Sequence, residues 1–115
     1  MGYLDGLWED RIYDERGDIV KRDVITLTQE GEEITGQIQR IYPQDQARRR
    51  WNLMGKLLGN DFMAIFWSDL PDIRSHGCWH LRLTSESLFS GYYLKTDEED
   101  ISSTRPVRLD LVRLP

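Results

Sequence analysis

Residues 78–83 read Cys-Trp-His-Leu-Arg-Leu, and this stretch decides the fold class. Apolar and other side chains alternate along it with a period of two. One set is Trp79, Leu81 and Leu83, and the other is Cys78, His80 and Arg82. Successive side chains of a β-strand point to opposite faces of the sheet, so this alternation predicts a strand with one buried face and one outer face.

The same period extends in both directions along the chain, interrupted by turn residues such as Glu30-Gly31-Glu32 and Gly59-Asn60-Asp61. The predicted strands are Tyr3–Tyr13, Ile19–Gln29, Ile34–Gln39, Ala47–Leu58, Phe62–Ser68, Cys78–Leu83, Leu88–Lys95 and Val107–Arg113. The range 52–58 also fits helical spacing, but Gly55 and Gly59 favour a strand there.

Eight short antiparallel strands predict a sheet that closes on itself, because closure removes exposed edges. We therefore expect an all-β, compact eight-stranded antiparallel up-and-down barrel, lipocalin/calycin-like, as one domain over residues 1–115. A two-sheet sandwich is the alternative. The predicted inward residues are Leu4, Trp8, Ile34, Ile38, Trp51, Leu53, Trp79, Leu81, Leu109 and Leu111.

Composition excludes several classes of protein. The net charge of −5 argues against a duplex-DNA binder, which needs a broad basic field. No apolar run is long enough to cross a bilayer, so we expect this chain alone to be soluble. The single cysteine, Cys78, cannot form an intrachain disulfide, which fits a reducing cytosolic setting. The start at Met1-Gly2 leaves room for further sequence upstream in the natural protein.

The loops differ between the two ends of the predicted barrel. Turns around Gly31, Asn60 and Ser85 are short, whereas the connections at the other end are long. The long connections are Asp14–Asp18, Pro43–Gln46, Asp69–His76 and Asp97–Arg105. Long loops on a rigid scaffold usually carry function, so we expect the mouth at that end. Many of the cations fall in or near those loops: Arg16, Lys21, Arg22, Arg40, Arg48, Arg49, Arg50, Arg74, Lys95 and Arg105.

Gly6-x-Trp8 opens the first strand, and Arg113 ends the last strand at the same end of the barrel. The tryptophan can plug that end, and the arginine can stack over its indole as a cation–π pair. This trio resembles the structural signature of lipocalin barrels. A chance occurrence of Gly-x-Trp in a β protein is the alternative.

Two further motifs carry chemistry, each with a simpler alternative. His76-x-Cys78-x-His80 puts three possible metal ligands on one strand face, but no other His or Cys supplies a fourth ligand. The preferred interpretation is therefore two surface histidines beside a packed cysteine.

Arg48-Arg49-Arg50-Trp51 joins phosphate-binding cations to a stacking surface. If Trp51 faces inward, Arg49 should lean into the mouth. The alternative is a charge cluster that only keeps the surface soluble.

No motif for catalysis, a P-loop or a dinucleotide-binding loop is present, and the run Asp97–Asp100 lacks the ligand spacing of a calcium loop. We therefore expect a protein that is not an enzyme and has no cofactor or metal.

Four short motifs run through the chain: Leu4-x-Gly6-x-Trp8, Gly77-x-Trp79-x-Leu81, Leu88-x-x-Gly91-x-Tyr93 and Pro106-Val107-Arg108-Leu109. With them the chain resembles the barrel domain of the two-transmembrane, β-strand-rich effectors of bacterial antiphage signalling by cyclic oligonucleotides (CBASS). The resemblance implies a sensor of a cyclic dinucleotide whose binding drives self-association and disrupts the inner membrane. It implies transmembrane segments, absent from this chain, that hold the barrel on the cytosolic face of that membrane.

From the residues themselves, we expect the ligand near the mouth. Arg40, Arg49 and Arg74 would neutralise phosphates, and Tyr42, Trp51 and Trp67 would stack bases. Two rival functions remain: a lipocalin-like carrier of a small apolar molecule, and a filled barrel that serves as a protein-interaction module.

Overall fold

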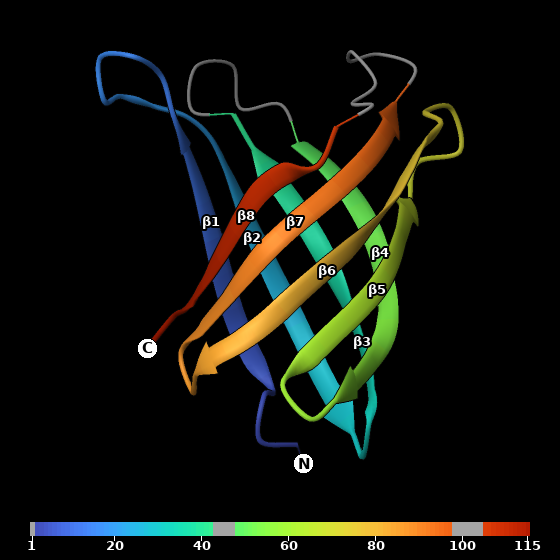
Figure 1. The fold of residues 1–115 in the computed structure, drawn as a ribbon. Helices are drawn as coiled ribbons and strands as arrows, with labels where there is room; N and C mark the ends of the chain where they lie inside the picture. Colours follow the sequence, from blue (N-terminus) through green and yellow to red (C-terminus); the bar gives the residue numbers. More distant parts are fainter. Residues whose placement is uncertain (1, 43–47, 98–104) are drawn as a thin grey trace.

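The computed structural model of the chain describes residues 2–42, 48–97 and 105–115, and only the backbone of Arg48 and Asp97 (Figure 1). Every element in it is a strand. The strands are β1 (Gly6–Tyr13), β2 (Ile19–Glu30), β3 (Glu33–Ile41), β4 (Arg48–Leu58), β5 (Asp61–Ser68), β6 (Ser75–Ser85), β7 (Leu88–Asp97) and β8 (Val107–Arg113). No helix in these ranges has the length and apolar composition needed to cross a bilayer.

Each strand pairs antiparallel with the next, and β8 returns to β1, so the sheet closes into an eight-stranded barrel. The predicted all-β, eight-stranded antiparallel barrel is confirmed, and the sandwich alternative is wrong. Residues 52–58 lie within β4, where Asn52 opposes Trp67 and Leu57 opposes Phe62, so the strand prediction holds there against the helical one.

Two strand starts differ from the predicted ones by three residues, and the other strand boundaries differ by two residues or fewer. β1 begins at Gly6, not Tyr3, because Gly6 has a φ of 136°, a backbone conformation that L side chains rarely adopt and that turns the chain into the strand. β6 begins at Ser75, so the loop predicted to reach His76 is shorter. The predicted loop Pro43–Gln46, residue Ala47 and residues 98–104 lie outside the described residues.

The barrel interior is a single apolar core. All ten residues predicted to face inward are buried, and Ile25, Leu27, Phe62, Ala64, Phe66 and Phe89 join them. The inner wall is tight even at its glycines: a Cβ on Gly77 would stand 2.5 Å from Phe66 Cζ. Aromatic rings therefore fill space that a side chain at Gly77 would need.

The N-terminal end of the barrel is plugged as predicted. Trp8 is fully buried, and its ring centroid lies 5.0 Å from that of Phe89. Arg113 opposes Trp8 across the closing pair of strands, with Cζ 5.3 Å from the indole centroid. Its Nη2 donates to the backbone oxygens of Tyr3 and Asp5 at 2.7 and 2.9 Å. Of the long connections, those over residues 14–18 and 69–74 lie at the opposite end, at the top of Figure 1.

Candidate functional site

Toward the open end, the inward-facing positions change from apolar to charged. Asp23 continues the inner face of β2 beyond Ile25, and Arg40 continues that of β3 beyond Ile38. On other strands Arg49, Ser75 and Lys95 take the corresponding positions, and the five residues are only 3–8% exposed. Strand alternation therefore turns these polar groups into the barrel, although burying charges is costly unless they are paired.

Arg40 and Asp23 form a two-point ion pair inside the barrel. Arg40 Nε donates to Asp23 Oδ1 at 2.8 Å, and Arg40 Nη2 donates to Asp23 Oδ2 at 3.0 Å. Burial lowers the pKa of the guanidinium, but the hydrogen bonds and charge of Asp23 outweigh it and raise the pKa above its usual value. Arg40 therefore stays positively charged inside the barrel.

Trp51 is the centre of this region. Three cationic groups surround its indole: Arg49 Cζ at 4.9 Å from the ring centroid, Arg40 Cζ at 5.3 Å and Lys95 Nζ at 5.7 Å. The indole Nε1 donates to Ser75 Oγ at 2.8 Å, which fixes the ring. We call Arg40, Arg49, Trp51, Ser75 and Lys95 the Trp51 cluster. Cation–π attraction holds positive charge over an aromatic face at the mouth.

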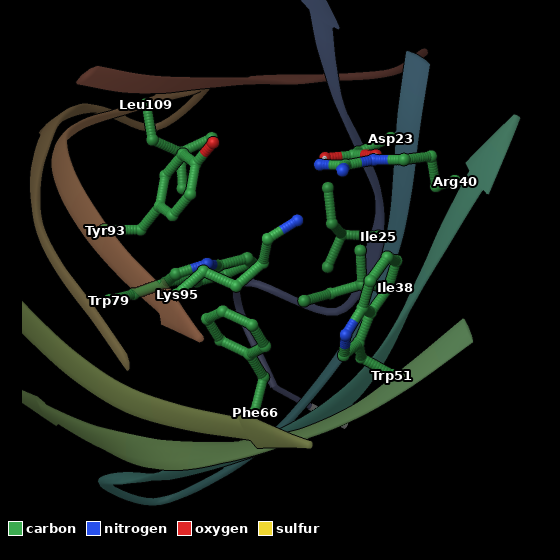
Figure 2. Close-up of a pocket in the computed structure, with 10 residues that line it drawn as sticks. All are labelled: Asp23, Ile25, Ile38, Arg40, Trp51, Phe66, Trp79, Tyr93, Lys95 and Leu109. Atoms are coloured by element: carbon green, nitrogen blue, oxygen red, sulfur yellow. Dashed lines mark hydrogen bonds and ion pairs between the residues drawn. The ribbon is translucent and has the colours of Figure 1, made fainter. Parts of the chain in front are cut away.

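A small cavity lies beside the cluster. Figure 2 shows the Lys95 side chain extending into the middle of the barrel, with the Arg40–Asp23 pair on one side and the Tyr93 ring on another. The volume of this cavity is about 20 Å³, room for about one water molecule. Arg40 Nη1 is buried, and it has no hydrogen-bond partner among the described residues. Such a donor is ready for an anionic ligand, since a buried unsatisfied group is costly.

A groove lies along the seam between β1 and β8. Only Trp8 and Glu9 of β1 oppose residues of β8, so the upper half of β1 has no partner on that side in the described ladder. The groove there has a volume of about 500 Å³ and is lined by Asp10, Tyr93, Asp110 and their neighbours. Burial raises the pKa of Asp10 to about 7, and the nearby Asp23 charge adds to the rise.

The structure brings together three of the six predicted site residues. Arg40, Arg49 and Trp51 all belong to the Trp51 cluster, and Arg49 leans over Trp51 as the alternation predicted. Tyr42 follows β3 directly and is half-buried near Arg40, where it helps to raise the pKa of that guanidinium, behind the larger effects of burial and Asp23.

The other two predicted residues lie apart from the cluster. Trp67 faces outward and is 39% exposed, so its predicted place at the mouth is wrong. The physical reason is the period of the strand: Phe66 is buried, and the next residue must point to the outer face. Arg74 is exposed in the loop before β6 and does not line the cavity.

Sequence reasoning missed Asp23, Ser75, Tyr93 and Lys95, which also line this region. A signal for them existed. Lys95 and Tyr93 lie in phase with buried Phe89, and Asp23 lies in phase with Ile25 and Leu27. Extending each inner face by one or two positions toward the long loops would have found them.

The His76-x-Cys78-x-His80 motif does not form a metal site among the described residues. His76 and His80 are exposed on the outer face of β6 as expected, but Cys78 is exposed beside them, so its expected packing is wrong. Across the described residues, no group of three His, Cys, Asp or Glu side chains is arranged to hold a metal ion.

Together these features define a class of structure: a closed, filled eight-stranded barrel with a plugged N-terminal end and a cationic, aromatic cluster at its open end. Comparison of the chain with protein-family models, curated proteins and solved structures found no match.

Proposed function

We propose that the chain is a non-catalytic sensor of a cyclic dinucleotide, which binds at the open end of the barrel. The observation that supports this most directly is the convergence of Arg40, Arg49 and Lys95 on the indole of Trp51. Phosphate is the natural partner of such a group, because guanidinium donors pair with phosphate oxygens and the site is held out of bulk water.

Each residue has a distinct role in this proposal. Arg40 presents Nη1 to a phosphate while Asp23 holds the other side of its guanidinium. Lys95 adds a positive charge on a long stem. Trp51 is 2% exposed beneath the cations, so it organises them, and base stacking falls to Tyr42 at the rim. This assigns Trp51 a different role from the stacking surface expected from the sequence.

The interior volume decides where the ligand binds. A cavity of about 20 Å³ holds a water molecule and not a nucleotide, so the ligand occupies the rim and side chains there rearrange. A carrier of an apolar molecule needs a pocket of several hundred Å³ inside the barrel. The cavity between the described side chains of the interior does not favour that rival function.

In the biological setting that we propose, binding drives self-association of a bacterial antiphage effector of the CBASS type at the cytosolic face of the inner membrane. Segments outside this chain would then disrupt the membrane. The charged open end faces away from the N-terminus, so an upstream membrane segment would leave the mouth toward the cytosol (Figure 1). This arrangement supports the proposal because a diffusible nucleotide must reach the mouth.

Isothermal titration calorimetry with a panel of cyclic dinucleotides, at low and high salt, tests the binding step. We expect selective binding that weakens as salt rises, because ionic contacts are screened. Lys95→Met and Arg40→Lys should each weaken binding by roughly 10-fold to 100-fold, the value of a charge-assisted hydrogen bond. Arg82→Ala is the matched control, since Arg82 is exposed on the outer face of β6. Binding that ignores salt and both cluster variants would contradict the proposal.

A further inference from the structure

The outer face of β4–β7 carries a continuous apolar surface. In a single row across four strands, Met54 opposes Ile65, Ile65 opposes Cys78, and Cys78 opposes Leu94. The next row down places Met63, His80 and Tyr92 side by side. We call this surface the apolar outer face, made of Met54, Met63, Ile65, Trp67, Cys78, His80, Tyr92 and Leu94.

The apolar side chains of this face are exposed next to one another, whereas an ordinary protein surface exposes apolar residues singly. Met63 is 62% exposed and Ile65 is 55% exposed. The outer face of β2 and β3 shows the ordinary arrangement, with Thr26 opposite Gln37 and Thr28 opposite Thr35. Contiguous apolar patches on one side of a soluble barrel mark an interaction surface, and Met and aromatic residues are enriched in such interfaces.

The charges around the apolar outer face favour a protein partner over a lipid surface. Its bordering cations are matched by acids: Lys56 opposes Glu33, and Arg82 opposes Asp61. Arg108 bonds to Asp110 at 3.2 Å. With a net charge of −5 and no unbalanced basic border, the face has no attraction for anionic headgroups.

The size of the face fits a weak, reversible contact. Four strands about 4.8 Å apart and five residues about 3.4 Å apart cover roughly 300–400 Å². That is smaller than the roughly 800 Å² per partner of a stable complex and corresponds to a transient one. An uncharged face is also complementary to itself across a two-fold axis, which is the commonest symmetry of protein dimers.

We infer that the apolar outer face binds the same face of a second copy of the chain. The contact leaves the mouth open, because the Trp51 cluster lies inside the barrel and the face lies outside it. The inference names the surface that makes contact in the self-association step of the proposed function. It rests on the proposed function only for the ligand that controls assembly. The contact itself requires only two copies of this chain.

Sedimentation equilibrium of the purified chain, with and without the cyclic dinucleotide selected by calorimetry, tests the inference. We expect a monomer–dimer equilibrium with a dissociation constant of roughly 10–100 µM, weakened at least 10-fold by Ile65→Glu. Thr26→Glu introduces the same charge on the outer face of β2 and should leave the equilibrium unchanged. Met63→Glu, at another exposed position, repeats the test if Ile65→Glu unfolds the barrel.

Cys78 provides an independent readout, because it is the only cysteine and lies in the central row of the face. Its alkylation rate should fall as protein concentration rises in the wild type and in Thr26→Glu, and stay constant in Ile65→Glu.

The two proposals fail separately. A chain that stays monomeric up to roughly 1 mM in both conditions, or whose dimer ignores Ile65→Glu and Met63→Glu, overturns the inference. If the chain stays monomeric and floats with phospholipid vesicles by binding them with this face, the inference is overturned and lipid is the partner. A dimer that depends on Ile65, formed by a chain that binds no nucleotide, keeps the inference and removes the proposed function.

Discussion

Both ends of the barrel contain a buried tryptophan with a guanidinium over its ring, yet the two arrangements serve different purposes. At the plugged end, Arg113 donates hydrogen bonds to the backbone oxygens of Tyr3, Asp5 and Glu86. At the open end, Arg40 is held by Asp23, and Nη1 is left without a partner in the described part of the chain. The same pair of residue types therefore stabilises the fold at one end and leaves a buried cationic donor at the other.

The surroundings of the two indoles explain this difference. Trp8 packs against Phe89, which in turn packs on Phe62 with ring centroids 5.4 Å apart, so the plugged end is a dry aromatic stack. Trp51 has cations around it instead. Apolar burial stabilises the first end, whereas the second buries charges whose desolvation opposes folding. We therefore expect mutations at the two ends to affect different properties, stability at one and binding at the other.

The largest expected effect comes from Trp8→Ala. Removing the buried indole that packs on Phe89 should lower the free energy of unfolding by about 3–5 kcal/mol, because the cavity cannot collapse under the packed barrel end. Urea denaturation followed by circular dichroism measures it. Trp67→Ala, at an exposed outer position, is the control and should change stability by less than about 1 kcal/mol. Equal losses of unfolding free energy in Trp8→Ala and Trp67→Ala would contradict the stabilising role of the plugged end.

The next effect concerns the buried ion pair at the open end. Asp23→Ala should cost about 3 kcal/mol, because it leaves the Arg40 charge buried among other cations. The double variant Asp23→Leu with Arg40→Met should recover most of that stability and lose nucleotide binding. Urea denaturation of Asp23→Leu, Arg40→Met and the double variant measures the coupling. If the double variant is as unstable as Asp23→Ala alone, the pair is structural and the contrast between the ends is wrong.

The third effect is a pH dependence that arises from Asp10 in the open half. Because the pKa of Asp10 is raised from 3.8 to about 7, the folded barrel holds a proton that the unfolded chain has released over that range. Its contribution is favourable below pH 4 and is lost as pH rises toward 7, on the order of 1–2 kcal/mol after allowance for partial solvent access. Asp10→Asn should abolish this slope in urea denaturation between pH 4 and pH 8. An unchanged slope would show that another group titrates.

The smallest effect sharpens the comparison of the two arginines. Arg113→Lys should lower stability by about 1 kcal/mol, because an ammonium cannot reach all three carbonyl oxygens that the guanidinium reaches. Nucleotide affinity should stay at the wild-type value in calorimetry. Arg40→Lys should show the converse, a loss of affinity that is large compared with its loss of stability. Weakened nucleotide binding in Arg113→Lys would place the ligand at the wrong end.

Much of the fold was predictable because strand alternation is a local property. Positions such as Leu81 and Leu109 were assigned inward from their neighbours in sequence, and both are buried. Arg113 was placed over Trp8 from the topology, and the structure confirms it. The strand start at Gly6 was missed because it depends on a backbone torsion rather than on hydropathy.

The candidate site was less predictable because Asp23 and the Trp51 cluster come from five strands, β2, β3, β4, β6 and β7. Trp67 was assigned to the mouth by its residue type, against the alternation that turns it outward. Ser75 and Lys95 were missed because their importance lies in contacts with Trp51 from other strands. Such contacts depend on the register between strands that are distant in sequence.

The amino-acid sequence by itself determined the strands, their inward faces and the end of the barrel that carries the long loops. These follow from side-chain periodicity and turn chemistry, which act between near neighbours. Only the tertiary structure decided that Asp23 neutralises one side of Arg40, that three cations meet on Trp51, and that the interior is filled. Those outcomes depend on strand register and barrel closure, which bring side chains from distant parts of the chain within a few ångströms of one another.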